Sequence, residues 1–497
     1  MSTAQNIDYK KLFEQAQSQI AALNHELAQL KKLIFGSRQE RFVLSAAPAG
    51  VVQGTLALSD EVITELKVTA ETIIVRQPAK VEIITQRKTH PARVLPAHLR
   101  REVIVLEPGK DVAGLRRLGF EVTEILEYLP GELFVKQYLR PIYVQPTPME
   151  ETIFIIASLP GRTMEKCMAG EGLLAQMAVD KYIDHLPINR QLQRFERTGV
   201  TIAQSTSNDW MRNVLNSLAG LYELHKKQVL ATHYLHVDET TIKVQDESKK
   251  GKTHLGYYWV YHNSEYKLVL FDYRTGRDRE GPNDILKDFT GYLQTDGYGV
   301  YDDFDKKPGI TLMHCMAHAR RKFTESLDSD PARAQYMLEQ MQALYAIERC
   351  IREEHLQPDE ILALRQSQTV PVLTLLKRWL QAEVSNVLPK SPIGQAIAYS
   401  LQRWDKLSIY ASDARLQIDN NPVERAIRPV AIGRKNYLFA GSHDAAQRSA
   451  MIYSLLATCT LHNINPYHWL KDVLERMHNY TMNNLNELLP QNWKPVN

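Results

Sequence analysis

The stretch HYLHVDETTIKV at residues 233–244 leads an apolar run directly into a carboxylate, Asp238. Alternating apolar and polar residues are typical of a β-strand. The segment GYLQTDGYGVY at 291–301 repeats the arrangement, with Asp296 just before Gly297, whose conformational freedom lets the chain turn away. A single acid at a strand end is usually a capping or turn residue. Two such acids on neighbouring strand ends indicate a shared cation, because a buried carboxylate without a partner is costly.

The segments between these two strands predict a mixed sheet. Strand-like runs GYYWVYHN at 256–263 and EYKLVLFDYR at 265–274 follow the first strand, and a helix is expected from about Pro282 to Phe289. Three antiparallel strands, a helix and a fourth strand form the opening of a ribonuclease-H-like fold. The expected fold class is a multidomain α/β protein with such a core, since 497 residues exceed what one hydrophobic core organises.

A third acid stands in a polar segment near the C-terminus, DNNPVERAIRPVAIGRKNYLFAGS at 419–442. Asp419 or Asn420 can cap a helix that Pro422 starts, which places Glu424 in the first turns of that helix. A surface ion pair would explain such a glutamate equally simply.

Cations surround this glutamate in the sequence. Arg425 is its neighbour, Arg428 lies one turn further on the same helix face, and Arg434 and Lys435 follow a glycine. Oxygen ligands beside phosphate-binding cations suit metal-assisted chemistry on nucleic acid. The segment therefore favours a DNA-contacting site around Glu424.

Residues 188–215 predict two helices joined by a turn at Gly199, with the second helix capped near Ser205. This arrangement suits a helix-turn-helix, whose second helix would offer Gln204, Ser205 and Asn208 to base edges or phosphates. An ordinary helical hairpin has the same pattern, so the sequence leaves both readings open.

The N-terminal region carries a heptad repeat at 8–36, with apolar residues at alternating spacings of three and four. A short coiled coil that makes a homo-oligomer is the favoured interpretation, and a single amphipathic helix is the alternative. The apolar positions are Phe13, Ala16, Ile20, Leu23, Leu27, Leu30 and Ile34.

The other boundaries follow from changes in composition and period. They are a linker with some strand at 45–91, a small β-rich module at 92–160, a helical DNA-binding region at 170–230, the two parts of the core at 233–330 and 411–478, and an all-helical insertion at 331–410.

Bulk composition excludes little. The net charge of +3 with 24% charged residues permits a nucleic-acid partner without demanding one. Four cysteines without a CxxC pair fit a reducing compartment, and neither a signal peptide nor a membrane span is recognisable, so a cytoplasmic protein without membrane contact is expected.

The segment HCMAHARRKF at 314–323 raises a zinc hypothesis, since His314, Cys315 and His318 have ligand-like spacing. No further ligand is evident in the sequence. DNA-phosphate contact or support of the active site is the favoured role of His318, Arg320, Arg321 and Lys322, and a plain solvated helix end remains the alternative for the three cations.

Together, HVDET, TDGYGVYD, HCMAHARRKF and the 419–442 segment resemble the catalytic blocks of the insertion sequence 66 family of bacterial transposases. The resemblance implies a DDE triad of Asp238, Asp296 and Glu424 that holds two Mg²⁺ ions, with Mn²⁺ as an expected substitute. It also implies Mg²⁺-dependent cleavage and strand transfer of double-stranded DNA, at the element ends and at the target. Accessory proteins of the element are further partners that it suggests.

One departure from the family concerns zinc. Family members often carry a small cysteine-based zinc module before the helix-turn-helix, and residues 114–144 resemble its interior without any flanking cysteine. Zinc is therefore not expected there. Apolar packing of Leu126, Leu129 and Val135 would have to maintain the module.

Two other functions remain alternatives. One is a ribonuclease-H-like nuclease or resolvase without strand transfer, because fold and triad do not fix the substrate. The other is a non-catalytic DNA-binding protein, against which the presence of all three acids and the basic segment argues.

Overall fold

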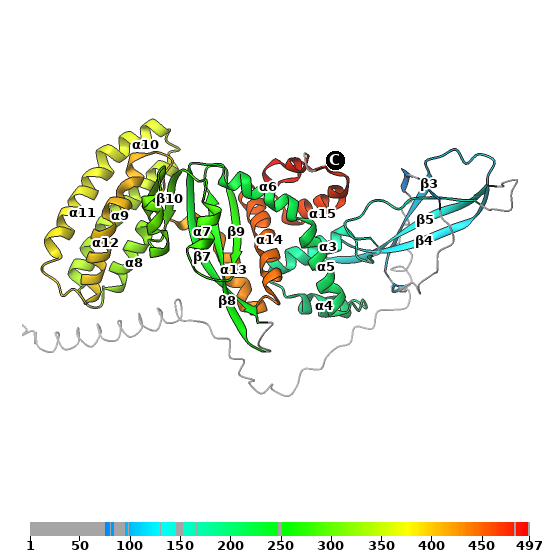
Figure 1. Cartoon of the computed structure of the whole chain (residues 1–497), viewed down its shortest axis with the longest axis horizontal. Helices are drawn as coiled ribbons and strands as arrows, with labels where there is room; N and C mark the ends of the chain where they lie inside the picture. Colours follow the sequence, from blue (N-terminus) through cyan, green and yellow to red (C-terminus); the bar gives the residue numbers. More distant parts are fainter. Residues whose placement is uncertain are drawn as a thin grey trace, which may run out of the picture. The chain divides into compact units, whose positions relative to one another are not determined.

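Figure 1 shows the computed structural model of the chain. It describes residues 75–79, 81–83, 95–97, 99–129, 131–145, 153–165, 167–246, 251–481 and 484–495. These all belong to one unit, Ala70–Asn497. The predicted coiled coil at 8–36 lies outside the described residues, as does most of the predicted linker.

A five-stranded mixed sheet carries the two acidic strands. Its spatial order is β11-β10-β7-β8-β9, so the first three strands in the chain form an antiparallel meander and the last two are added parallel beside β7. The strands are β7 (Tyr234–Gln245), β8 (Thr253–Asn263), β9 (Leu268–Arg274), β10 (Gly291–Thr295) and β11 (Ile310–His314). The four predicted strands are present, and α7 (Glu280–Ile285) overlaps the first half of the helix predicted from about Pro282 to Phe289. The sequence reading missed β11, which is a five-residue strand.

Two helices after the insertion, α13 (Asn421–Tyr437) and α14 (His443–Leu461), pack against this sheet, and the next helix, α15 (Pro466–Arg476), packs against α14. Two hydroxyls of α14 accept backbone N–H groups of the edge strand β9, Ser454 from Phe271 at 2.8 Å and Thr458 from Val269 at 3.2 Å. The helix therefore satisfies the donors that an uncovered edge strand would leave free.

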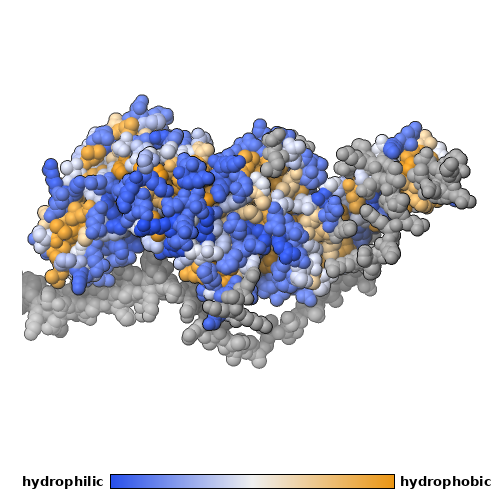
Figure 2. Space-filling model, in the orientation of Figure 1, coloured by the Kyte–Doolittle hydropathy of each residue, from blue (hydrophilic) through white to orange (hydrophobic). Residues whose placement is uncertain are grey.

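The predicted insertion is all-helical, as expected. It contains α9 (Pro331–Glu353), α10 (Pro358–Leu364), a π-helical turn at Arg365–Thr369, α11 (Val370–Glu383) and α12 (Pro392–Ser408). Figure 1 shows these helices gathered together, and their buried side chains share one hydrophobic cluster with α8 (Met316–Glu325), which follows β11 directly. Figure 2 shows the molecule in the orientation of Figure 1. The surface on this face is largely hydrophilic, with smaller apolar patches.

The β-rich module is a six-stranded sheet in which β5 is the central strand. Along its whole length β5 pairs with β4, and on its other side with β3 and then β6. Leu126 and Val135 are fully buried, as the sequence predicted for a module without zinc. The strands are β1 (Val75–Ala79), β2 (Val81–Ile83), β3 (Arg101–Pro108), β4 (Arg116–Leu129), β5 (Glu132–Gln145) and β6 (Ile153–Ala157).

The helices before the five-stranded sheet share its core instead of forming a separate one. They are α3 (Glu171–Tyr182), α4 (Ile188–Arg197), α5 (Gln204–Ser217) and α6 (Ala219–Leu230). Buried residues of all four helices belong to one hydrophobic cluster with residues of α14, α15 and the strands β7, β8 and β9. The predicted turn at Gly199 is present, with φ of +81°. The second helix begins at Gln204, so its N-cap is Ala203, two residues before the predicted cap at Ser205, and Ala203 makes no side-chain cap.

Candidate active site

The register of the central strands brings Asp238 and Asp296 to the same level of the sheet. In the parallel pairing of β7 with β10, His236 stands opposite Gln294. Each aspartate comes two residues after its member of this pair, so the two acids are neighbours across the strands. Asp296 follows the last residue of β10, as predicted, whereas Asp238 lies inside β7, which continues to Gln245.

The turn after Asp296 is held by the insertion. The hydroxyl of Tyr399, on α12, donates to the backbone oxygen of Asp296 at 2.9 Å, and Arg403 donates to the oxygen of Gly297 at 3.2 Å. Gly297 has φ of +89°, and a Cβ there would lie only 3.0 Å from both side chains. The Oδ1 of Asp296 accepts the backbone N–H of Tyr298 at 2.7 Å. Glycine is therefore required both for the backbone conformation and for this close contact.

The start of α13, the helix that carries Glu424, is attached to β7 next to Asp238 by its N-cap residue, Asn420. The amide nitrogen of this buried side chain donates to the oxygen of Val237 at 2.9 Å, and its Oδ1 accepts from His236 Nδ1 at 3.0 Å. The sequence assigned Asn420 or Asp419 to capping, but Asn420 makes no side-chain cap and is used on β7 instead. Side chains alternate along a strand, so the face of β7 that carries His236 and meets α13 also carries Asp238.

The electrostatics of Asp238 reflect this convergence. Burial, followed by the negative charges of Glu239 and Asp296 and more weakly of Glu424, raises the pKa of Asp238 well above its usual range. Glu239 has partners of its own, since its carboxylate pairs with Arg277 and accepts the hydroxyl of Tyr301 at 3.0 Å. Asp238 is therefore affected by the charges of both other predicted acids, whereas the carboxylate of Glu239 is already occupied by protein donors.

Glu424 lies closest to a cysteine and a histidine. Ligand atoms of Cys315, His318 and Glu424 all lie within 4.8 Å of one another, which the three acids of the predicted triad do not achieve among the described side chains. His318 Nδ1 is 3.9 Å from Glu424 Oε1, and both atoms are buried without a hydrogen-bond partner. Burial raises the pKa of the Cys315 thiol to about 12, although the backbone hydrogen bonds that the sulfur accepts act in the opposite direction.

Two family models match this chain. The model described as "Transposase IS66 family" matches residues 166–448, and the one described as "IS66 C-terminal element" matches residues 454–491. The first match contains all three predicted acids. The chain belongs to the IS66 family of transposases.

Relatives of the transposase occur in Sinorhizobium fredii (strain NBRC 101917 / NGR234). The uncharacterized protein y4jD is 31% identical over 97% of this chain and 96% of its own length. The uncharacterized protein y4hP is 30% identical over 96% of this chain and 89% of its own. The similarity therefore extends well beyond the residues that the family models match.

The transposase presents most of the predicted DNA-contacting cations to solvent. On α13, Arg425, Arg428 and Lys435 are exposed, and their spacing puts them on one face of the helix. On α8, Arg320, Arg321 and Lys322 are exposed as well. Lys322 lies 3.9 Å from Glu325, and the other five form no ion pair among the residues that the structure describes.

Arg434 differs from these cations because it bonds inward. Its Nη1 donates to Thr240 Oγ1 at 3.0 Å and to the backbone oxygen and Oγ1 of Thr241 at 2.7 and 2.8 Å. The sequence predicted a phosphate contact here. In the structure the Arg434 side chain joins α13 to β7. The exposed Lys435 is therefore the residue of this pair for which a phosphate contact stays a prediction.

The residues predicted to read DNA on α5 are accessible. Gln204, Ser205 and Asn208 are exposed, and the Gln204 side-chain amide donates to Asn208 Oδ1 at 3.2 Å. Nearby, Arg190 of α4 donates to Asn436 Oδ1 at 3.4 Å, which links this helix pair to the end of α13. This bond joins α4, the first helix of the pair, to the C-terminal end of the helix that carries Glu424.

Sequence reasoning missed the residues that position the acids. Asn420 was assigned to the wrong partner, and Tyr399 and Arg403 lie about a hundred residues after the turn that they hold. A buried asparagine next to an N-cap gives a local signal at best. The two α12 contacts leave no signal in a single sequence.

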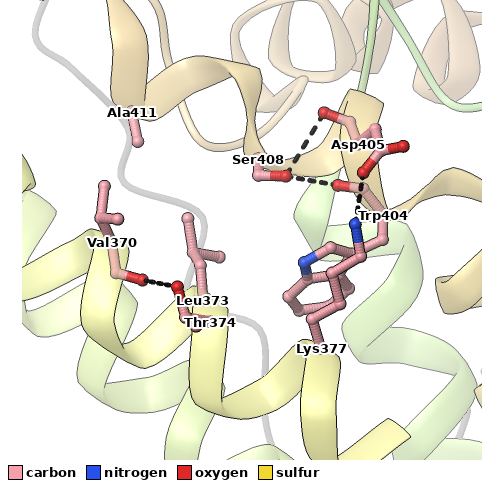
Figure 3. A pocket seen from close by; sticks show the side chains of 8 residues that line it. All are labelled: Val370, Leu373, Thr374, Lys377, Trp404, Asp405, Ser408 and Ala411. Atoms are coloured by element: carbon pink, nitrogen blue, oxygen red, sulfur yellow. Dashed lines mark hydrogen bonds and ion pairs between the residues drawn. The ribbon is translucent and has the colours of Figure 1, made fainter. Parts of the chain in front are cut away.

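One hollow in the insertion lies away from all these residues. Figure 3 shows its lining from α11 and α12, where Lys377 Nζ pairs with Asp405 at 2.8 Å beside Trp404. None of the predicted site residues lines it.

In the described part of the chain, no helix is long and apolar enough to cross a membrane.

Proposed function

We propose that this transposase cleaves the ends of its insertion sequence and joins them to target DNA, with Asp238, Asp296 and Glu424 as ligands for Mg²⁺. The proposal is supported by the β7–β10 register, which makes Asp238 and Asp296 neighbours, and by Asn420, which joins the start of the Glu424 helix to β7. The strand order supports a ribonuclease-H-like core, because an antiparallel three-stranded meander with two parallel strands added beside its first strand defines that topology.

The donor set fits magnesium. Mg²⁺ prefers carboxylate oxygens and keeps several waters, so a few acids around an open space suffice. Glu424 Oε1 is buried without a hydrogen-bond partner, and a buried unsatisfied carboxylate oxygen is costly unless a cation binds it. Asp238 and Asp296 are partly exposed, so a metal ion and a substrate phosphate could reach both carboxylates.

Bound magnesium would supply Lewis-acid activation of the attacking water or 3′-hydroxyl and of the leaving oxygen. The chain itself would supply position. Tyr399 and Arg403 fix the turn that aims Asp296, and Asn420 fixes the start of the helix that aims Glu424. The exposed cations of α13 and α8 would hold the DNA phosphates beside these acids, since phosphate contacts set register and orientation.

Strand joining tests this proposal most directly. Full-length protein is incubated with double-stranded DNA that carries the element's end, an unrelated target DNA and Mg²⁺. We expect nicked ends and joined products, and neither when Mg²⁺ is omitted. Nicks without joined products would favour a nuclease or resolvase, and binding without nicks would favour a non-catalytic DNA-binding protein.

Two kinds of DNA contact should fail differently. Lys435→Ala removes a phosphate contact, so binding should weaken about equally on element-end and random DNA, and the slope of log K against log salt should shrink by about one. Asn208→Ala or Gln204→Ala should cost about 1–3 kcal/mol on the element end alone if either reads a base edge. Titrations of both DNAs at several salt concentrations measure this. Equal losses for Asn208→Ala on both DNAs would assign α5 to packing or nonspecific contact.

Oligomerisation through the N-terminal heptad is a separate proposal. Leu23→Glu with Leu27→Glu should abolish a and d packing and lower the mass measured by light scattering. Charged substitutions at Gln15 and Gln29, which lie on the outer face of the heptad repeat, serve as the matched control and should leave the mass unchanged. An unchanged mass for the leucine variant would exclude the coiled coil as the assembling element.

A further inference from the structure

Three side chains with metal-ligand chemistry meet where two helices begin. Cys315 is the N-cap of α8, His318 lies in the first turn of that helix, and Glu424 lies in the first turn of α13. Their ligand atoms are within 4.8 Å of one another. The sequence grouped Cys315 and His318 with His314 and lacked a further ligand. The structure supplies Glu424, a residue more than a hundred positions away in the chain.

The geometry is close to that of a bound ion. In a tetrahedral zinc site, adjacent nitrogen, oxygen and sulfur ligands are separated by about 3.4–3.6 Å, given metal–ligand lengths of about 2.0–2.3 Å. His318 Nδ1 and Glu424 Oε1 are 3.9 Å apart, so a shift of about half an ångström would suffice. Both atoms are buried and lack any hydrogen-bond partner, which is unusual for polar atoms unless an unseen group binds them.

The sulfur is in a position to act as a thiolate ligand. Cys315 Sγ accepts the backbone N–H of Asn420 at 3.1 Å, and it also accepts a backbone hydrogen bond from His318. Backbone donors at a helix N-terminus stabilise a thiolate. A metal that binds here displaces the thiol proton, which leaves to solvent.

We propose that Cys315, His318 and Glu424 form a site for a soft divalent cation of the Zn²⁺ class. Thiolate and imidazole select Zn²⁺ over Mg²⁺, which requires oxygen ligands. Three protein ligands leave a fourth position open to water. On the proposed function, Glu424 is also a magnesium ligand, so zinc and magnesium should compete for it. The missing cysteines of the β-rich module do not bear on this second site.

Cobalt reports on such a site without any measurement of activity. Full-length, metal-free protein is titrated with Co²⁺, and thiolate-to-cobalt absorption is followed. We expect an absorption that saturates at one ion per chain, disappears in Cys315→Ser and persists in Cys350→Ser, whose side chain is a partly exposed thiol elsewhere. No thiolate absorption in the parent, or an undiminished one in Cys315→Ser, would refute the site.

Further variants protect the test from folding defects and from failure of the proposed function. His318→Gln changes a more accessible side chain and should weaken Co²⁺ binding by about tenfold or more. Asp238→Asn should keep the absorption, so this variant separates the soft-metal site from the proposed triad.

Zn²⁺ should raise the Mg²⁺ concentration needed for cleavage. Full cleavage at unchanged Mg²⁺ with the site loaded would refute the sharing of Glu424.

Discussion

Replacing Asp238 with asparagine is expected to abolish DNA cleavage and strand joining while DNA-end binding is retained. The amide has the size of the carboxylate but no charge, so the proposed magnesium site loses a ligand without a change in volume. Loss of partners that only orient a ligand typically costs about 10- to 100-fold, so loss of a ligand should exceed about 100-fold. Asp296→Asn and Glu424→Gln should have effects of the same size.

The chain offers a matched control one residue away. Glu239→Gln also neutralises a carboxylate, but this side chain is already paired with Arg277 and Tyr301, and an amide can keep one of those contacts. We expect less than about a tenfold loss, the effect of one hydrogen bond of about 1 kcal/mol. Gel-based cleavage rates and end-binding titrations on all four variants decide the matter. Normal cleavage in any triad variant would remove that acid from the site.

The strands that carry the acids could be predicted because their signal is local. The runs before Asp238 and Asp296 are apolar and alternate, and both strands were found where that pattern placed them. β11 was missed because it runs directly into a helix with no turn residue to mark its end, whereas the equally short β10 is followed by Asp296 and Gly297. Its pairing with β10 decides that it is a strand, and pairing is a long-range property.

The contacts that aim the acids could not be predicted for the same reason. Asn420 precedes a proline-started helix, so its local context indicated a cap, yet its side chain is hydrogen-bonded to β7. Arg434 follows a glycine in a basic run, and its bonds to Thr240 and Thr241 depend on how α13 lies across the sheet. Tertiary contacts override local preference at both residues.

Substitution of Arg365 should have the largest effect on stability in the insertion. Its side chain is almost fully buried in the π-helical turn, where it forms a two-pronged pair with Glu348 at 2.9 and 2.7 Å. It also donates to the backbone oxygens of Tyr410, Asp413 and Leu416 at 2.7–2.9 Å. Arg365→Leu would leave a buried carboxylate and three carbonyls without partners. We expect a loss of about 3–5 kcal/mol in unfolding free energy, measured by urea denaturation.

Two companion variants separate charge from geometry in this prediction. Arg365→Lys keeps the charge but loses the planar fork, so it should still destabilise strongly. Glu348→Gln keeps a hydrogen-bond acceptor and all three carbonyl contacts but leaves the buried guanidinium without its countercharge, so its loss should be near the lower end of the range expected for Arg365→Leu, about 3 kcal/mol. The carbonyls that Arg365 holds belong to the segment leading into Asn420 and Glu424, so Arg365→Leu should also slow cleavage at temperatures where the protein stays folded. A stability loss below about 1 kcal/mol, with unchanged cleavage, would show that the insertion does not hold the third acid in place.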